Sequence, residues 1–140
     1  MRFWDTSALV PLITKEDQTP RMQQVIASDR NIAVSFITPV ELTSTIWRRG
    51  RRYDQTSFRR SLFKVAELES NWTLLDEHEP TIKLARQLIT KHVLRTGDAI
   101  QLAAALLLVA DHPEDLPFVS LDHDLSRAAR EEGFPVVGAR

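Results

Sequence analysis

Four carboxylates lie where a short apolar segment meets the start of a helical pattern: Asp5, Glu41, Asp98 and Asp122. Carboxylates gathered without a nearby Lys repel one another, by about 4 kcal/mol at ~4 Å and an effective dielectric constant of roughly 20. Such a cluster either retains protons at a raised pKa or binds a cation. Because all-oxygen ligands favour hard cations, the pattern predicts Mg²⁺ or Mn²⁺, which can activate water and hold phosphate oxygens.

The same acids also fit a simpler interpretation as helix caps. Thr38-Pro39-Val40-Glu41 matches a capping box, in which Glu41 would accept a hydrogen bond from the backbone of Thr38. Asp5 and Asp122 could each cap the helix that follows, and the helix dipole favours Asp98 in a first turn. Two features favour the cluster. Asp98 opens a nearly all-apolar and therefore central helix, and Ser120 shares a strand face with Asp122. Both interpretations remain open on the sequence alone.

The elements that must position these acids alternate between short apolar segments and helical patterns. Apolar segments predict strands at residues 3–4, 32–35, 72–75, 118–121 and 134–137. Apolar residues at helical spacing predict helices at residues 21–28, 40–49, 58–68, 82–89, 97–110 and 125–132. Strands separated by helices predict an α/β fold with a parallel sheet and helices on both faces. In such a fold the carboxyl ends of the strands form the edge at which ligands bind.

Composition limits the alternatives. A chain of 140 residues with 43% hydrophobic and 26% charged residues is typical of one globular domain. The absence of Cys excludes disulfides, thiolate zinc sites and cysteine nucleophiles. The longest apolar run, residues 100–110, contains Gln101 and falls short of the ~20 residues that span a bilayer, so we expect a buried helix and no membrane. An acid at position 5 is too early for a signal peptide, and we expect a cytoplasmic protein.

The net charge of −1 conceals an uneven distribution. Residues 48–60 contain six Arg and one Asp, a net of +5, whereas the remainder has twelve basic and eighteen acidic residues, a net of −6. The stretch is either a solvated helix end or a phosphate-binding track formed by Arg48, Arg49, Arg51 and Arg52. Tyr53, Trp47 and Phe58 could stack on bases of single-stranded RNA. We expect Trp47 and Phe58 in the core instead.

Four short motifs follow one another along the chain. They are Asp5-Thr6-Ser7-Ala8-Leu9, Thr38-Pro39-Val40-Glu41-Leu42, Gly97-Asp98-Ala99-Ile100-Gln101-Leu102-Ala103 and Val119-Ser120-Leu121-Asp122-His123-Asp124-Leu125. Each motif is weak alone. Together, and in this order, the sequence resembles the PIN-domain ribonucleases, particularly the VapC-type toxins of prokaryotic toxin–antitoxin pairs, over essentially the whole chain.

The resemblance implies a single PIN-like domain over residues 1–140. Its fold would be a three-layer α/β/α sandwich whose central parallel sheet has four to five strands in the order 3-2-1-4-5. It also implies a Mg²⁺- or Mn²⁺-dependent endoribonuclease that acts as a toxin, is blocked by a cognate antitoxin and forms homodimers. A catalytically silent PIN-like module that binds RNA or a partner is the alternative.

The resemblance also implies roles for individual residues. The catalytic acids would be Asp5, Glu41, Asp98 and Asp122, with Asp5, Asp98 and Asp122 as metal ligands. The supporting residues would be Thr6, Ser7, Ser120 and Asp124. Three features depart from the commonest pattern. Asp124 adds a fifth acid, and the sequence leaves open whether it or Asp122 faces the metal more directly. Trp4 replaces a smaller aliphatic residue, which we attribute to core packing, and Ser120 stands where Thr is frequent but keeps the hydroxyl.

Overall fold

The computed structural model of the protein describes residues 1–52 and 54–139, so the expectation for Tyr53 lies outside the described residues. Five parallel strands form one sheet in the order β3-β2-β1-β4-β5, as the sequence resemblance implies. The strands are β1 (Arg2–Trp4), β2 (Ile32–Ser35), β3 (Thr73–Leu75), β4 (Phe118–Ser120) and β5 (Val136–Gly138). β2 and β4 are buried at every position, which explains why both are continuously apolar apart from a terminal Ser.

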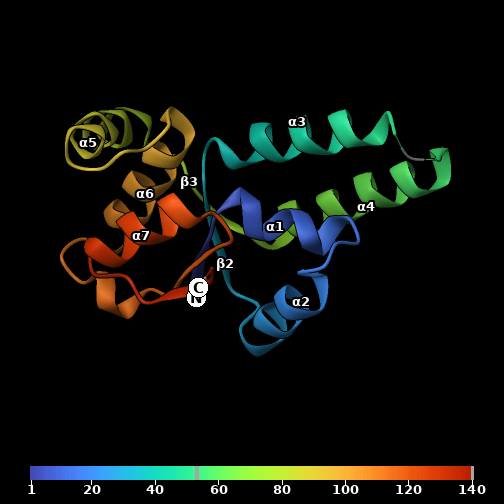
Figure 1. Cartoon of the computed structure of the whole chain (residues 1–140), viewed down its shortest axis with the longest axis horizontal. Helices are drawn as coiled ribbons and strands as arrows, with labels where there is room; N and C mark the ends of the chain where they lie inside the picture. Colours follow the sequence, from blue (N-terminus) through green and yellow to red (C-terminus); the bar gives the residue numbers. More distant parts are fainter. Residues whose placement is uncertain (53, 140) are drawn as a thin grey trace.

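Helices cover both faces of this sheet. In chain order they are α1 (Thr6–Ile13), α2 (Thr19–Ser28), α3 (Thr38–Gly50), α4 (Gln55–Asn71), α5 (His78–Lys91), α6 (Thr96–Val109) and α7 (His123–Glu131). A short 3₁₀ helix, Pro113–Asp115, precedes β4. Figure 1 shows α5, α6 and α7 on one side of the sheet and α1 to α4 on the other. The architecture is therefore the expected α/β/α sandwich.

Side-chain alternation along the strands separates two hydrophobic cores. Phe3 and Ala33 pack with residues of α5, α6 and α7, whereas Trp4 and Val34 pack with residues of α1 to α4. Trp4 is fully buried, which confirms that its bulk serves core packing. Since neighbouring strand residues face opposite layers, the register of β1 determines which side chain enters which core.

α6 is the central helix predicted from its apolar sequence. Its residues Ala99 and Gln101 to Ala105 are all buried, and it ends at Ala110, whose φ of 52° is incompatible with a continuing helix. No single helix in the described part of the chain is long and apolar enough to cross a membrane. α5 and α6 reach that length and composition only as a pair bent by 116°.

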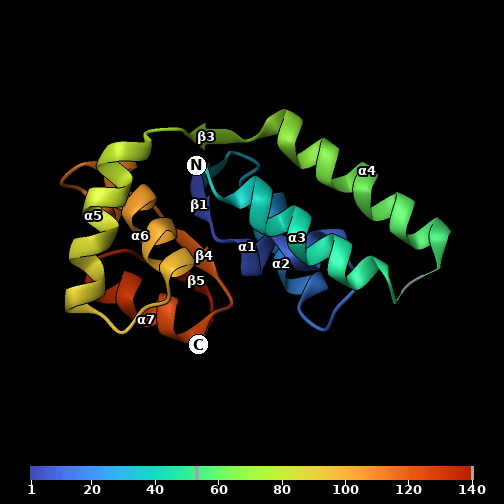
Figure 2. The same cartoon turned by 90° about the horizontal axis from the view of Figure 1, so that it is seen from above.

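Two local expectations are wrong. α3 begins at Thr38 after Ile37, with no side-chain cap, so Thr38 and Glu41 do not form a capping box. Trp47 is not in the core: it is 53% exposed and makes an edge contact with Phe58, which is partly buried against α3. Tertiary structure explains both. The Glu41 side chain bonds to α1 and α6, and the C-terminal part of α3, which holds Trp47, projects beyond the sheet together with α4 (Figure 2).

Candidate functional site

Asp5 directly follows β1 and is 4% exposed, and its carboxylate is held through one oxygen. Oδ2 accepts hydrogen bonds from the backbone N–H and the hydroxyl of Ser7 and from the hydroxyl of Ser120. Oδ1 accepts none from residues 1–52 and 54–139. The pKa of Asp5 is raised to about 6, chiefly by burial; the Ser7 hydrogen bond opposes the rise and the charge of Glu41 adds to it. Asp5 therefore caps α1 and still has an oxygen available to a ligand.

Glu41, in the first turn of α3, is held in the same way from two other helices. Its Oε1 accepts hydrogen bonds from the Thr6 hydroxyl in α1 (2.9 Å) and from the Gln101 amide in α6 (2.7 Å). No donor among the described residues reaches Oε2. This oxygen lies beside the start of α6, because a Cβ on Gly97 would come within 2.9 Å of it.

Asp122 is the third carboxylate anchored through a single oxygen. Its Oδ1 accepts the backbone N–H of Leu125 at 2.8 Å and so caps α7. Its own N–H donates to the hydroxyl of Ser120, which also donates to Asp5. Asp5 and Asp122 therefore cap helices as the simpler interpretation predicts, and this is compatible with the cluster interpretation, since the other oxygen of each stays without a protein donor in the described chain.

Asp98 differs from the other three because its carboxylate has no hydrogen-bond donor among the residues that the structure describes. Its pKa is raised to about 7, first by burial and then by the charges of Asp122, Asp5 and Glu41, while the Arg95 charge opposes the rise. Since all three other acids act on Asp98, the structure brings the four predicted carboxylates to one edge of the sheet.

This donor set fits a hard divalent cation. The charges of the other three acids raise the pKa of Asp98, but no three of the four carboxylates have oxygens within 4.8 Å of one another. Mg²⁺ is commonly bound by one or two carboxylates, with water and substrate phosphate oxygens completing its coordination, so an open group of acids is suitable. The closer set of His112, Glu114 and Asp115 is fully exposed. It lies beyond the opposite end of α6, where nothing connects it with the four acids.

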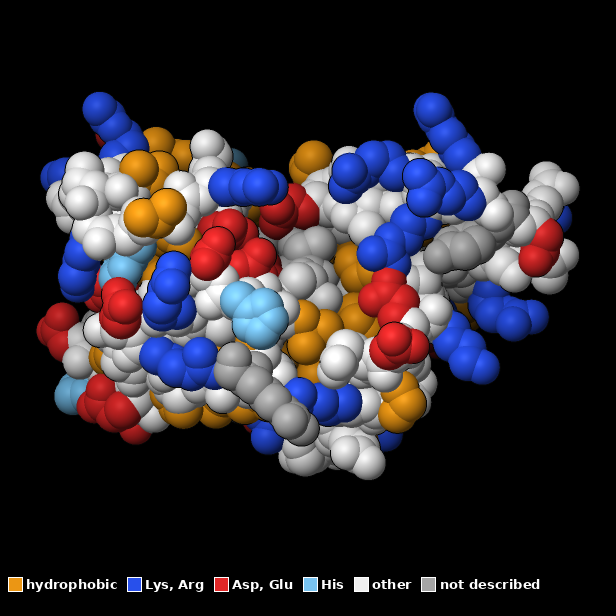
Figure 3. Space-filling model, viewed as in Figure 1, with side chains coloured by type: hydrophobic (Ala, Val, Ile, Leu, Met, Phe, Trp, Pro, Cys, Tyr) orange, Lys and Arg blue, Asp and Glu red, His pale blue; other side chains and the backbone are white. Residues whose placement is uncertain are grey.

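A basic groove begins beside this cluster. A cavity of about 520 Å³ is lined by Thr6 and Ser7 at one end and by Arg48, Arg49 and Arg52 along α3 and its C-terminal end. Figure 3 shows Asp and Glu side chains near the middle of this face and Lys and Arg side chains on the neighbouring right-hand part. Arg49 also pairs with Glu16 and donates to the Thr14 hydroxyl at 3.2 Å, so its guanidinium is held in place. The arginine side chains of this groove can bind the phosphate groups of a chain that runs toward the four acids.

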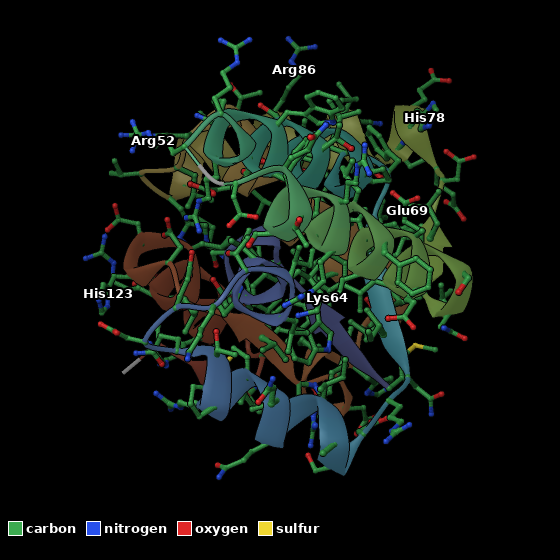
Figure 4. All side chains as sticks on the ribbon, turned by 90° about the vertical axis from the view of Figure 1, so that its right-hand side faces the viewer. Arg52, Lys64, Glu69, His78, Arg86 and His123 are labelled. Carbon is green, nitrogen blue, oxygen red and sulfur yellow. The ribbon has the colours of Figure 1, made fainter. Side chains whose placement is uncertain are left out.

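Three expected or considered residues lie apart from the cluster. Asp124 is 68% exposed at its side chain and pairs with Arg127. Arg51 is exposed and does not line the groove. His123 lies on the surface, on the same side of the molecule as Arg52 in Figure 4. We therefore leave Asp124 and Arg51 out of the candidate site.

Sequence reasoning assigned no role to Gln101 or Gly97. Gln101 is fully buried and contacts both Glu41 and Thr6. The sequence did contain a sign of this role. Gln101 is the one amide in an otherwise apolar helix, and because it follows Asp98 by three residues, it lies on the same helical face as that acid. The role of Gly97 depends on the position of the Glu41 carboxylate, for which the sequence offers no signal.

Comparison with known proteins identifies the fold family. The chain resembles FitAcB from Neisseria gonorrhoeae (TM-score 0.68, 16% identity, 99% of this chain and 97% of that one). It also resembles a toxin-antitoxin complex from Klebsiella pneumoniae (0.67, 19%, 98% and 96%) and VapBC2 from Rickettsia felis bound to a promoter DNA fragment (0.66, 15%, 98% and 97%). No curated protein matches. Residues 2–131 match the PIN domain family, and the chain therefore belongs to that family.

Proposed function

We propose that this protein is a metal-dependent endoribonuclease that cleaves RNA phosphodiester bonds. The observation that carries the proposal is the set of four acids in which burial and mutual repulsion raise the pKa of Asp98 to about 7 and that of Asp5 to about 6. A site that retains protons when empty favours a divalent cation, because bound positive charge removes the repulsion. The adjoining arginine-lined groove supports a polyanionic substrate.

Asp5, Asp98 and Asp122 would hold Mg²⁺ or Mn²⁺. When bound, such a cation supplies Lewis-acid activation of water and stabilises charge on the phosphate. Ser7 and Ser120 keep Oδ2 of Asp5 occupied and so orient the carboxylate. Glu41, with Oε1 anchored and Oε2 without a protein donor in the described chain, is suited to accept a proton from attacking water. Arg48, Arg49 and Arg52 would bind phosphates of the RNA beside the scissile bond.

We further propose that this nuclease is the toxin of a type II toxin–antitoxin pair. The solved structures with a similar fold include a toxin-antitoxin complex and VapBC2, which favours a cognate antitoxin as partner. A homodimer and a cytoplasmic location complete the proposal. Growth arrest on expression, relieved by co-expression of a small neighbouring gene, is the expected biological result; growth unaffected by expression of a folded, active nuclease would contradict the toxin assignment.

The activity is tested with purified protein, a labelled single-stranded RNA and Mg²⁺, Mn²⁺ or chelator. We expect cleavage with metal, none with chelator, and loss of cleavage in Asp5→Asn and Asp98→Asn. Asp111→Asn is the matched control, since this exposed acid follows the opposite end of α6. Metal-dependent cleavage that survives both site substitutions would refute the assignment of the site. RNA binding without cleavage would instead favour the silent binding module.

Metal binding has a readout that needs no substrate. A ligand that binds only the folded state stabilises it by about 2.7 kcal/mol at one hundred times its Kd. We expect millimolar Mn²⁺ to raise the melting temperature of the wild type at pH 8 and to have little effect on Asp98→Asn. Equal melting temperatures of the wild type with and without Mn²⁺ would contradict a metal site.

A further inference from the structure

Gln101 is a fully buried amide in the middle of the hydrophobic layer formed by α6. Its neighbours Leu102, Ala103, Ala104 and Ala105 are equally buried. An amide in such a place is unfavourable unless its hydrogen bonds are made. Gln101 makes them with residues of two other helices, so its contacts indicate what the amide is for.

The Gln101 amide nitrogen has three acceptors within reach. It lies 2.7 Å from Glu41 Oε1, 3.1 Å from the Thr38 hydroxyl and 3.2 Å from the Thr6 hydroxyl. The amide has only two hydrogens, so at most two of these bonds form at once. The contact with Glu41 is the shortest and has a carboxylate acceptor, which makes it the strongest of the three.

Thr6 completes the restraint on Glu41. Its hydroxyl donates to the same Oε1 at 2.9 Å while accepting from Gln101. Thr38 is itself buried against Ser35 at the end of β2. The Glu41 carboxylate is thus tied to α1 and α6 through one oxygen.

This restraint decides where the second oxygen lies. Glu41 Oε2 packs against Gly97, the residue before Asp98, so closely that a Cβ there would be 2.9 Å away. A glutamate in the first turn of an exposed helix would otherwise sample several rotamers, because its side chain has three rotatable bonds. Holding Oε1 therefore holds Oε2 against Gly97, at the start of α6.

We infer that Gln101 is a positioning residue, which together with Thr6 holds the Glu41 carboxylate beside the start of α6 in the geometry that cleavage requires. The test of this inference by cleavage rate rests on the proposed nuclease function. The test by the position of the Glu41 carboxylate depends on the structure alone. The competing explanation is that Gln101 only satisfies Thr6 and Thr38 inside the core. Under the first explanation, loss of the Gln101 amide lowers cleavage only because it moves the Glu41 carboxylate. Under the second, the effect of that loss on cleavage does not depend on Glu41.

A double-mutant cycle separates them. Gln101→Met keeps the volume and removes the amide, and Leu102→Met is the matched control in the same helix. We expect Gln101→Met to lower the single-turnover cleavage rate by about 10- to 100-fold, the usual effect of removing a partner that orients a site residue. In a Glu41→Gln background the same change should alter the residual rate less than about twofold, since coupled residues are not additive. An equal loss in both backgrounds, or no loss in the wild type, would overturn the inference.

A crystal structure of Gln101→Met tests the geometry without any activity. We expect the Glu41 carboxylate to leave its place beside Gly97 in this variant and to keep it in Leu102→Met. A Glu41 side chain that stays in place would overturn the inference even if the protein proves to be a nuclease. Conversely, a displaced carboxylate in a protein without nuclease activity would contradict only the proposed function.

Discussion

Ser120 Oγ, at the end of β4, lies 3.1 Å from Asp5 Oδ2, at the end of β1, although 115 residues separate the two in the chain. The contact exists because β1 and β4 are parallel neighbours with Trp4 opposite Val119. The same hydroxyl accepts the N–H of Asp122, so one serine links two of the acids. The order and register of the strands therefore determine the geometry of the cluster.

Asp122 and Asp124 are two residues apart, but the structure predicts unequal roles. Asp122→Asn should lower metal-dependent cleavage at least about tenfold more than Asp124→Asn, because the charge of Asp122 helps to raise the pKa of Asp98, whereas Asp124 is 68% exposed at its side chain and pairs with Arg127. Asparagine is as good a helix cap as aspartate, so Asp122→Asn should keep α7 intact. Cleavage rates and melting curves of the two variants check this. A larger loss of cleavage in Asp124→Asn would place the metal on the other side of α7.

The raised pKa of Asp98 predicts how pH affects the metal-free protein. Between its ordinary value of 3.8 and about 7, the folded state holds a proton that the unfolded state has lost. Stability contributed by this group therefore falls as pH rises through that range and is constant above it. Asp98→Asn removes the effect, so its melting temperature relative to the wild type should rise from pH 4 to pH 7 and then level off.

Thermal melts of both proteins in chelator, at half-unit steps from pH 4 to pH 8.5, measure this difference. Comparing the variant with the wild type cancels the contributions to stability of carboxylates with lowered pKa values. Asp29 is one of these, and its contribution changes with pH in the opposite direction. A difference that stays constant across the range would show that Asp98 keeps an ordinary pKa in the folded state. Adding Mn²⁺ at pH 8 should reverse the order of the two melting temperatures.

The strands were predictable because each strand of the parallel sheet is a short apolar run between helical patterns. Their order was implied only by the family resemblance. The same holds for α6, whose apolar sequence predicted its central place. The acids were predictable as a set because parallel strands end at one edge. Their pairing with particular hydroxyls was not, since Ser7, Ser120 and Thr6 meet their acids through the sheet register and the packing of helices.

The wrong expectations have a common physical cause. The Thr38–Glu41 spacing fits a capping box, but Thr6 and Gln101 offer the Glu41 carboxylate two donors from other helices. Similarly, Trp47 was expected in the core from its type alone. Its position on α3, beyond the sheet, leaves more than half of it exposed. In both cases the tertiary structure overrides what the local sequence favours.

Gly97→Ala should separate stability from activity. Alanine is favoured over glycine in a helix by up to about 1 kcal/mol, so the melting temperature should stay the same or rise. The new methyl group would lie 2.9 Å from Glu41 Oε2 and must displace the carboxylate. We expect cleavage to fall about tenfold or more, as when a site residue is misplaced by about 1 Å. In a Glu41→Gln background the substitution should have little further effect; an undiminished rate in Gly97→Ala would show that this carboxylate tolerates displacement.

Removal of Arg48 or Arg52 should weaken RNA binding in a salt-dependent way. Both side chains line the groove that begins at Thr6 and Ser7. For single-stranded RNA, each phosphate contact contributes about 0.7 to the slope of log affinity against log salt. Arg48→Gln and Arg52→Gln should each reduce this slope by about 0.7 and weaken binding most at low salt. Fluorescence anisotropy with a labelled oligonucleotide, between low and physiological salt, measures both quantities.

Arg86→Gln is the matched control for charge. It removes the same positive charge from α5, which lies on the other face of the sheet from α3. In Figure 4, Arg86 lies well apart from His123. A general effect of net charge would weaken RNA binding equally in all three variants, because long-range attraction depends on total charge. A phosphate track requires the loss to be larger in Arg48→Gln and Arg52→Gln. Equal slopes in the three variants would assign the arginine-rich stretch to solvated surface, which is the alternative that its sequence left open.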